Sequence, residues 1–256
     1  MSTKSKKKNI IKNKVKGPVN GHSIKIAINS DDMTEFIDAA LTVGSEFRLI
    51  VKSDMVSLNK VDDGNVLMLI ASCKCESSLK GEEQLKFGIN AEVLKKAMRF
   101  SKGSNAILHI DGENLTVNYG RIHAKIPLVN ESVLRADPKG ITIKTTTAID
   151  MPGKYLHEIC QFISGNGKCR IYTDNGAVFI TAEEGDLYIR EIVGTCDNDV
   201  QANSLFSNDY LKIISKIVKK TGIKVHLGNG VPTRILAEHN GCKYEFMLAP
   251  MGEGEY

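Results

Sequence analysis

The chain carries the stretch AEVLKKAMR at residues 91–99, and a related stretch, NDYLKIISK, lies 117 positions later at residues 208–216. In both copies the basic residues follow one another at steps of four and three, which places them on one face of an α-helix. The apolar positions coincide as well, so that Leu94 falls on Leu211. An internal repeat of this kind constrains the whole architecture. It predicts two copies of one domain, each of which presents a basic helix.

The basic side chains around these two stretches form one set, which we call the basic stripe. It consists of Lys95, Lys96, Arg99, Lys102, Lys212, Lys216, Lys219 and Lys220. A repeated stripe of this sign predicts a surface that binds a negatively charged partner. The alternative for any single helix is an ordinary solvated face.

The first part of each half repeats at an offset of about 122 residues, where residues 47–51 match residues 169–173. Each block is followed by a turn and an alternating strand. Amphipathic helices precede the blocks, at residues 31–43 and 153–164. Each half is therefore expected to contain a helix, several strands, a second helix and several further strands. This order predicts an α+β fold.

Composition limits the class of protein. The 256 residues are 25% charged and 42% hydrophobic, which suits two globular domains of roughly 110 to 120 residues. The sequence has no apolar run of roughly 18 residues and no secretory signal pattern, so we expect an intracellular protein without membrane contact. Residues 1–21 hold seven lysines and no acid, and without those seven charges the net charge of +4 becomes −3. The tail is typical of a disordered basic extension.

Nothing in the sequence predicts catalysis. It has no P-loop, no G-x-S-x-G and no H-E-x-x-H motif, and its six histidines are isolated. The six cysteines lack metal-ligand spacing, and we expect incidental thiols, without stable disulfides, in a reducing compartment. We therefore expect neither an enzyme nor a cofactor or metal.

Five stretches follow one another along nearly the whole body: VSLNKVDDGNVLM (56–68), GIN (88–90) before the first basic helix, AKIPLV (124–129), MP (151–152), and KYEFMLAP (243–250). Together they resemble the DNA sliding clamps of the proliferating cell nuclear antigen (PCNA) family, in an archaeal-like form. The resemblance implies two similar domains of the DNA-clamp fold, with helices on one face of antiparallel sheets. The implied boundaries are a tail (1–21), an N-terminal domain (22–129), a connector (130–140), a C-terminal domain (141–251) and a C-terminal tail (252–256).

The resemblance also implies a function: a polymerase processivity factor in DNA replication and repair. Three subunits would close into a ring, and the basic stripe would face duplex DNA without reading its sequence. DNA polymerase, clamp loader, flap endonuclease and DNA ligase would bind through short peptide motifs. The protein would be associated with DNA in the cytoplasm of an archaeon or in a eukaryotic nucleus.

Client peptides of the family dock in a groove beneath the connector. The matching positions here are Val61, Val66, Val133, Leu134, Pro232, Met247, Ala249 and Pro250. Each of them could instead be plain core packing. The family joins subunits through edge strands, for which we expect residues 114–119 and 177–182.

The first helix departs from the family pattern, because it carries Asp31, Asp32, Glu35 and Asp38 and no basic residue. The third helix keeps only Lys154 and His157 as basic groups. These departures favour an alternative, in which the chain is a subunit of a heteromeric or damage-checkpoint clamp. A further alternative, from another class of protein, is a monomeric duplicated domain that binds a small ligand.

Overall fold

The computed structural model describes residues 23–101, 103–163 and 167–252. The lysine-rich tail (1–21), Lys102 of the basic stripe and nearly all of the C-terminal tail lie outside these residues.

The first half of the chain runs from β1 to β9. Its elements are β1 (Ile24–Asn29), α1 (Ser30–Leu41), β2 (Glu46–Val51), β3 (Met55–Val61), β4 (Leu67–Lys74), β5 (Glu76–Ser77), β6 (Leu85–Asn90), α2 (Ala91–Met98), the 3₁₀-helix η1 (Arg99–Ser101), β7 (Asn105–Asp111), β8 (Asn114–Tyr119) and β9 (Ile122–Pro127). The connector (130–140) follows and contains the short 3₁₀-helix η2 (Glu131–Val133).

The second half repeats this order. Its elements are β10 (Thr147–Pro152), α3 (Gly153–Phe162), β11 (Lys168–Asp174), β12 (Ala177–Glu184), β13 (Leu187–Thr195), β14 (Asn203–Ser207), α4 (Asn208–Val218), β15 (Gly222–Leu227), β16 (Thr233–His239) and β17 (Cys242–Leu248). The starts of α2 and α4 lie 117 residues apart, as the sequence repeat predicts.

The strands form antiparallel sheets in the same order in both halves. A five-stranded sheet has the order β5-β1-β7-β8-β9, and a four-stranded sheet has the order β13-β12-β11-β14. The eight-stranded sheet, β10-β15-β16-β17-β4-β3-β2-β6, contains strands of both halves. Its joint is the ladder between β17 and β4, from Cys242 opposite Cys73 to Leu248 opposite Leu67. One continuous sheet therefore ties the two halves together.

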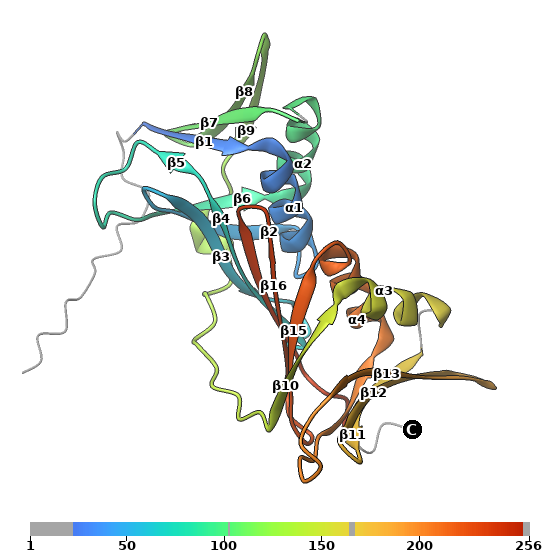
Figure 1. Ribbon diagram of the computed structural model, residues 1–256. Helices are drawn as coiled ribbons and strands as arrows, with labels where there is room; N and C mark the ends of the chain where they lie inside the picture. The colour runs from blue at the N-terminus through green and yellow to red at the C-terminus, as the bar shows by residue number, and fades with distance from the viewer. Residues whose placement is uncertain (1–22, 102, 164–166, 253–256) are drawn as a thin grey trace, which may run out of the picture.

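The helices α1, α2, α3 and α4 lie along one side of the molecule, and the connector runs along the opposite side (Figure 1). We call the first of these the helix side. There α1 packs against both α2 and α4, and α3 packs against α4. The α3–α4 contact is close, because a Cβ atom at Gly153 would collide with the backbone carbonyl of Val218. The basic helices of the two halves thus share one surface.

Local sequence explains how the helices begin and what they bury. Asn29 caps α1 by accepting hydrogen bonds from the backbone N–H groups of Asp31 and Asp32, and Asn90 caps α2 in the same manner. The apolar stripe of α1, which includes Phe36, packs onto the sheet against Phe47 of β2, with ring centroids 6.2 Å apart. The charged residues of the helices consequently point away from the sheets.

The predicted edge strands are wrong. Residues 114–119 form β8 and residues 177–182 lie in β12, and both strands pair with neighbours on their two sides. Instead β9 and β13 end their sheets. Val178 and Ile180, which we expected to need an external partner, are already buried. An alternating pattern identifies a strand but carries no information on its place in the sheet.

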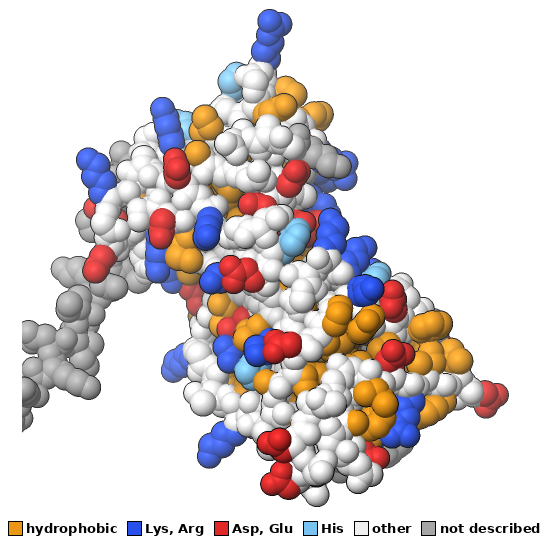
Figure 2. All heavy atoms as spheres, viewed as in Figure 1, with side chains coloured by type: hydrophobic (Ala, Val, Ile, Leu, Met, Phe, Trp, Pro, Cys, Tyr) orange, Lys and Arg blue, Asp and Glu red, His pale blue; other side chains and the backbone are white. Residues whose placement is uncertain are grey.

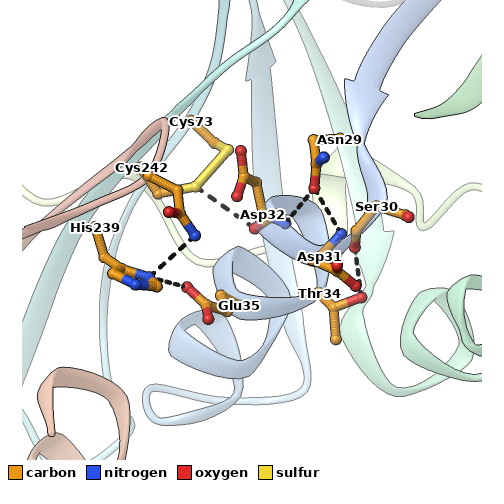
Figure 3. The surroundings of a disulfide bond; sticks show 10 residues. Asn29, Ser30, Asp31, Asp32, Thr34, Glu35, Cys73, His239 and Cys242 are labelled. Atoms are coloured by element: carbon orange, nitrogen blue, oxygen red, sulfur yellow. Dashed lines mark hydrogen bonds and ion pairs between the residues drawn. A yellow bond between two sulfur atoms is a disulfide. The ribbon is translucent and has the colours of Figure 1, made fainter. Parts of the chain in front are cut away.

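The expectation of thiols is also wrong for two of the six cysteines. Cys73 of β4 and Cys242 of β17 face each other in the register and are joined by a disulfide (Figure 3). No sequence pattern predicts this pair, because the contact depends on the β17–β4 joint between the two halves. Cys75, Cys160, Cys169 and Cys196 are free.

Candidate nucleic-acid interface and connector groove

Four exposed members of the basic stripe lie on the helix side without an ion-pair partner among the described residues. Lys96 lies on α2, Arg99 follows it in η1, Lys216 lies on α4, and Lys219 comes directly after α4. None of these four forms an ion pair within the described part of the chain. Figure 2 shows basic side chains gathered between α1 and α4, with acidic ones among them. These four charges are thus available to an external anion.

The other described members of the stripe have partners in the fold. Lys95 forms an ion pair with Asp38 of α1 at 2.7 Å, and Lys220 lies 3.8 Å from Glu35. Lys212 is half-buried and donates to the carbonyl oxygen of Ile163 at 3.5 Å, beyond the end of α3. The sequence could not distinguish these residues from the four that lack an ion-pair partner, since the pairing depends on how α1 packs between α2 and α4.

The acidic residues of α1 lie between the two basic helices. Glu35 accepts a hydrogen bond from His239 at 2.8 Å (Figure 3). Glu35 also forms the ion pair with Lys220. Asp32 is close by, and burial together with the charge of Glu35 raises its pKa. The helix side is therefore a band of mixed sign, and its centre carries negative charge.

His157 adds no positive charge to this surface at neutral pH. Its Nδ1 atom lies 3.0 Å from the hydroxyl of Ser215 on α4. Burial and the positive charges of Lys219 and Lys216 lower the pKa of His157 below its ordinary value. Lys154, which is exposed, is the remaining basic residue on α3.

A cavity of about 400 Å³ lies beneath the connector. Val61 of β3 and two connector residues, Val133 and Leu134, line it, as the sequence predicts for the client groove. The remaining predicted groove residues, Val66, Pro232, Met247, Ala249 and Pro250, do not line this cavity. Val66 follows Asn65, which lines the cavity, and the N–H of Ala249 donates to the carbonyl of Val66 at 2.9 Å, so these two residues lie near its end. Met247 is 7% exposed and faces Met68 across the β17–β4 ladder.

Asp62 holds the turn beside this cavity in shape. Its carboxylate accepts hydrogen bonds from the N–H groups of Val66 and Leu67, both at 2.8 Å. It also accepts one from the hydroxyl of Tyr210 on α4 at 2.8 Å. Burial and this hydrogen bond raise the pKa of Tyr210. Asp62 thus joins the turn of the first half to a helix of the second.

The connector is attached to the first half by polar groups that sequence reasoning missed. Asp137 accepts from Arg48 of β2 at 2.6 Å and from Lys86 of β6 at 2.7 Å. The mixture of charges in the connector was visible in the sequence. The partners on β2 and β6 were not, because they lie 89 and 51 residues away.

The described residues contain no cluster of three or more histidine, cysteine, aspartate or glutamate side chains that could hold a metal ion. The described helices also include none that is long and apolar enough to span a membrane.

The chain is similar along nearly its whole length to known DNA polymerase sliding clamps. The chain is 26% identical over 248 residues to a DNA polymerase sliding clamp of Methanoregula boonei, covering 91% of this chain and all of that protein. It is 27% identical over 251 residues to the clamp of Methanoculleus marisnigri, with the same coverage. No family model matches the chain.

Solved structures give the same answer for the fold. One is Archaeoglobus fulgidus PCNA bound to the C-terminal region of FEN-1, with a TM-score of 0.78, 22% identity, and coverage of 91% of this chain and 100% of that chain. Another is PCNA of Entamoeba histolytica, with a TM-score of 0.78, 12% identity, and coverage of 90% and 99%. A PCNA2–PCNA3 complex of Sulfolobus tokodaii has a TM-score of 0.72 at 16% identity and coverage of 90% and 99%.

The fold is therefore that of the DNA sliding clamps, which confirms the predicted fold class. The archaeal relatives, which are matched along their whole length, together with the structural neighbours support a PCNA-family sliding clamp.

Proposed function

We propose that this chain is a subunit of a ring that encircles duplex DNA, slides along it and holds replication and repair proteins there. The observation that carries the proposal is the clamp fold, with exposed basic residues of both halves on one side of the sheets. Lysine and arginine contacts to phosphates give attraction that is independent of sequence and sensitive to salt. Enclosure of the DNA then keeps the protein bound while it moves.

The repeated topology supports ring closure by copies of this chain. By their places in the sheets, β9 corresponds to β17, and β13 corresponds to β4. Within the chain β17 pairs with β4, so β9 of one copy can pair with β13 of the next in the same manner. Such a contact is heterologous and closes into a ring when the rotation permits it.

The surface of β13 suits a protein contact. Leu187, Tyr188 and Ile192 are 45%, 56% and 64% exposed, and Ile122 of β9 is 40% exposed. Figure 2 shows hydrophobic side chains gathered around α3, β12 and β13. Exposed apolar patches of this kind mark interaction sites.

Client proteins would bind at the groove under the connector. Val61, Val133 and Leu134 line its cavity, and Ala249 and Pro250 would continue it toward the C-terminus. The neighbour from A. fulgidus, solved with the C-terminal region of FEN-1, supports peptide recruitment as the mode of binding. Polymerase, loader and ligase are further expected clients.

The domains would span residues 22–129 and 141–251, separated by the connector, and the chain would have no catalytic activity of its own. It would work inside the cell, on DNA. A mixed ring is the second candidate, favoured by the acidic residues of α1 and by the PCNA2–PCNA3 neighbour.

The proposal can be tested on linear DNA, because a closed ring can thread over the free end of the DNA without a clamp loader. Duplex DNA is fixed to beads at one end, the protein is added, and the free end is then blocked by a bulky protein. We expect protein that resists a high-salt wash until a restriction enzyme reopens the DNA. Retention that is the same on open and blocked DNA would contradict encirclement.

A further inference from the structure

The connector is fixed to the first half of the chain at several points. Arg48 of β2 donates to Asp137 at 2.6 Å and to the carbonyl oxygen of Arg135 at 3.2 Å, and it lies 3.9 Å from the carboxylate of Glu131. One arginine thus contacts three positions over half of the connector's length. Its side chain is only 12% exposed.

Lys86 of β6 adds the second bond to Asp137, at 2.7 Å. The side chains of Asp137 and Lys86 are 23% and 20% exposed, so water screens this cluster less than it screens a surface ion pair. Charge-assisted hydrogen bonds of this length are about twice as strong as neutral ones.

The cluster and the cavity share their residues. Arg48, Asp137, Val133 and Leu134 all line the cavity of about 400 Å³. The attached connector therefore leaves a space beneath it instead of covering the sheet. A peptide that enters this space does not have to order the connector first, and preorganisation of this kind raises affinity.

We propose that Asp137, with Arg48 and Lys86, forms a clasp that fixes the connector in its open position, and that client affinity depends on this clasp. The inference rests on the proposed client groove and adds the residues that control it. Asp137 is a positioning residue, because it acts through Val133 and Leu134 and is not required to touch the peptide.

The clasp is charged at neutral pH. Burial alone would raise the pKa of Asp137, but the hydrogen bonds from Lys86 and Arg48 lower it overall. The folded pKa lies below the ordinary value, so the stabilisation is complete above the unfolded pKa of about 3.9. This stabilisation is lost as the pH falls through the folded pKa. The ion pairs of the clasp therefore stay formed in the physiological pH range.

The test uses Asp137→Asn, which keeps the shape of the side chain but turns one acceptor into a donor facing the Lys86 ammonium. Asp54→Asn in the β2–β3 turn is the matched control, because Asp54 is exposed, does not line the cavity and forms no ion pair among the described residues. The first measurement is the rate of trypsin cleavage after Arg135 and Lys139 in the full-length protein. We expect Asp137→Asn to be cut at least about fivefold faster than the wild type and the control.

The second measurement is the affinity of the same variants for a synthetic peptide with the sequence of the C-terminal region of FEN-1 that is bound to A. fulgidus PCNA. We expect Asp137→Asn to bind about tenfold more weakly, a loss of about 1.4 kcal/mol. Arg48→Met should give a similar loss, and the double variant should lose little more, since both changes break one cluster.

Unchanged cleavage and unchanged affinity in Asp137→Asn would each overturn the clasp. If the wild-type protein does not bind the peptide at all, the client groove is wrong, and the cleavage rates still support or overturn the attachment of the connector. A circular dichroism spectrum like that of the wild type shows that the variants have folded.

Discussion

Glu35 is an acidic residue of α1 that pairs with two basic side chains on the helix side. It is paired with His239 at 2.8 Å (Figure 3) and with Lys220 at 3.8 Å, between the basic helices of the surface that we propose for DNA. A phosphate that approaches Lys220 has to compete with this carboxylate. The acid would weaken the hold on DNA and favour sliding over tight binding.

Replacing Glu35 with glutamine should increase association with duplex DNA. Exposed ion pairs are worth about 0.2–1 kcal/mol, which corresponds to an increase of up to about fivefold. Fluorescence anisotropy with a short duplex at low salt measures it. Glu238→Gln is the control, because Glu238 also pairs with a lysine but lies on β16 and is 59% exposed. If the two variants bind duplex DNA with equal affinity, Glu35 does not weaken DNA binding.

Reversing two exposed members of the basic stripe should have the opposite effect. In Lys96→Glu with Lys216→Glu, loss of two phosphate contacts per subunit lowers the slope of log affinity against log salt by about 2. Stability should change by only about 0.5 kcal/mol, since both side chains are exposed. The measurement is a salt titration of DNA binding.

The matched variant reverses Lys52 in the β2–β3 turn and Lys80 in the β5–β6 loop, which are equally exposed. It makes the same change of net charge outside α2, α4 and the basic stripe. If both double variants lose the same affinity, the net charge of the protein matters and the stripe has no special role.

At the scale of elements, the repeat predicts how two subunits pair. Following the ladders, Ala124 of β9 corresponds to Phe246 of β17, and Ile189 of β13 corresponds to Leu69 of β4. Phe246 and Leu69 face each other within the chain. We therefore expect Ala124 of one subunit to face Ile189 of the next.

Cysteines at Ala124 and Ile189 should cross-link neighbouring subunits. The Phe246–Leu69 pair lies four residues from the Cys242–Cys73 disulfide, so it is the same type of cross-strand pair and can accept a disulfide. A non-reducing gel should show covalent multimers that disappear on reduction. Moving the first cysteine to Lys125 turns it to the other face of the strand, and that variant should stay uncross-linked. Equal cross-linking in both would refute the register.

The sequence was sufficient for the order of elements and for which helices are basic, because both follow from local periodicity and from the repeat. It was not sufficient for contacts between elements. The pairing of Lys95 with Asp38, the attachment of Asp137 to Arg48, and the position of β9 at a sheet end all depend on packing. Residues of one type on one face looked equivalent in the sequence, although only some of them are free of partners.

At the scale of the whole molecule, the β17–β4 joint holds the two halves together, and a disulfide crosses it. Cys73 and Cys242 are both buried and lie 169 residues apart in the sequence. A bridge that closes so long a loop restricts the unfolded chain strongly in the entropic model. The bridge thus stabilises the joint that gives the subunit its shape.

Reduction of this bridge should lower the free energy of unfolding by about 2–5 kcal/mol. Urea unfolding with and without a reducing agent measures the difference, with a lower midpoint expected under reducing conditions. Cys242→Ser should unfold at the lower midpoint under both conditions. A wild-type midpoint that does not respond to the reducing agent would contradict a stabilising bridge.

Closure of a ring by copies of this chain predicts the mass of the protein in solution. Light scattering over a dilution series should give about 84 kDa, three times the chain mass of 28.1 kDa, with little change on dilution. A mass that stays at one or two chains at every concentration would contradict a ring made of this chain alone.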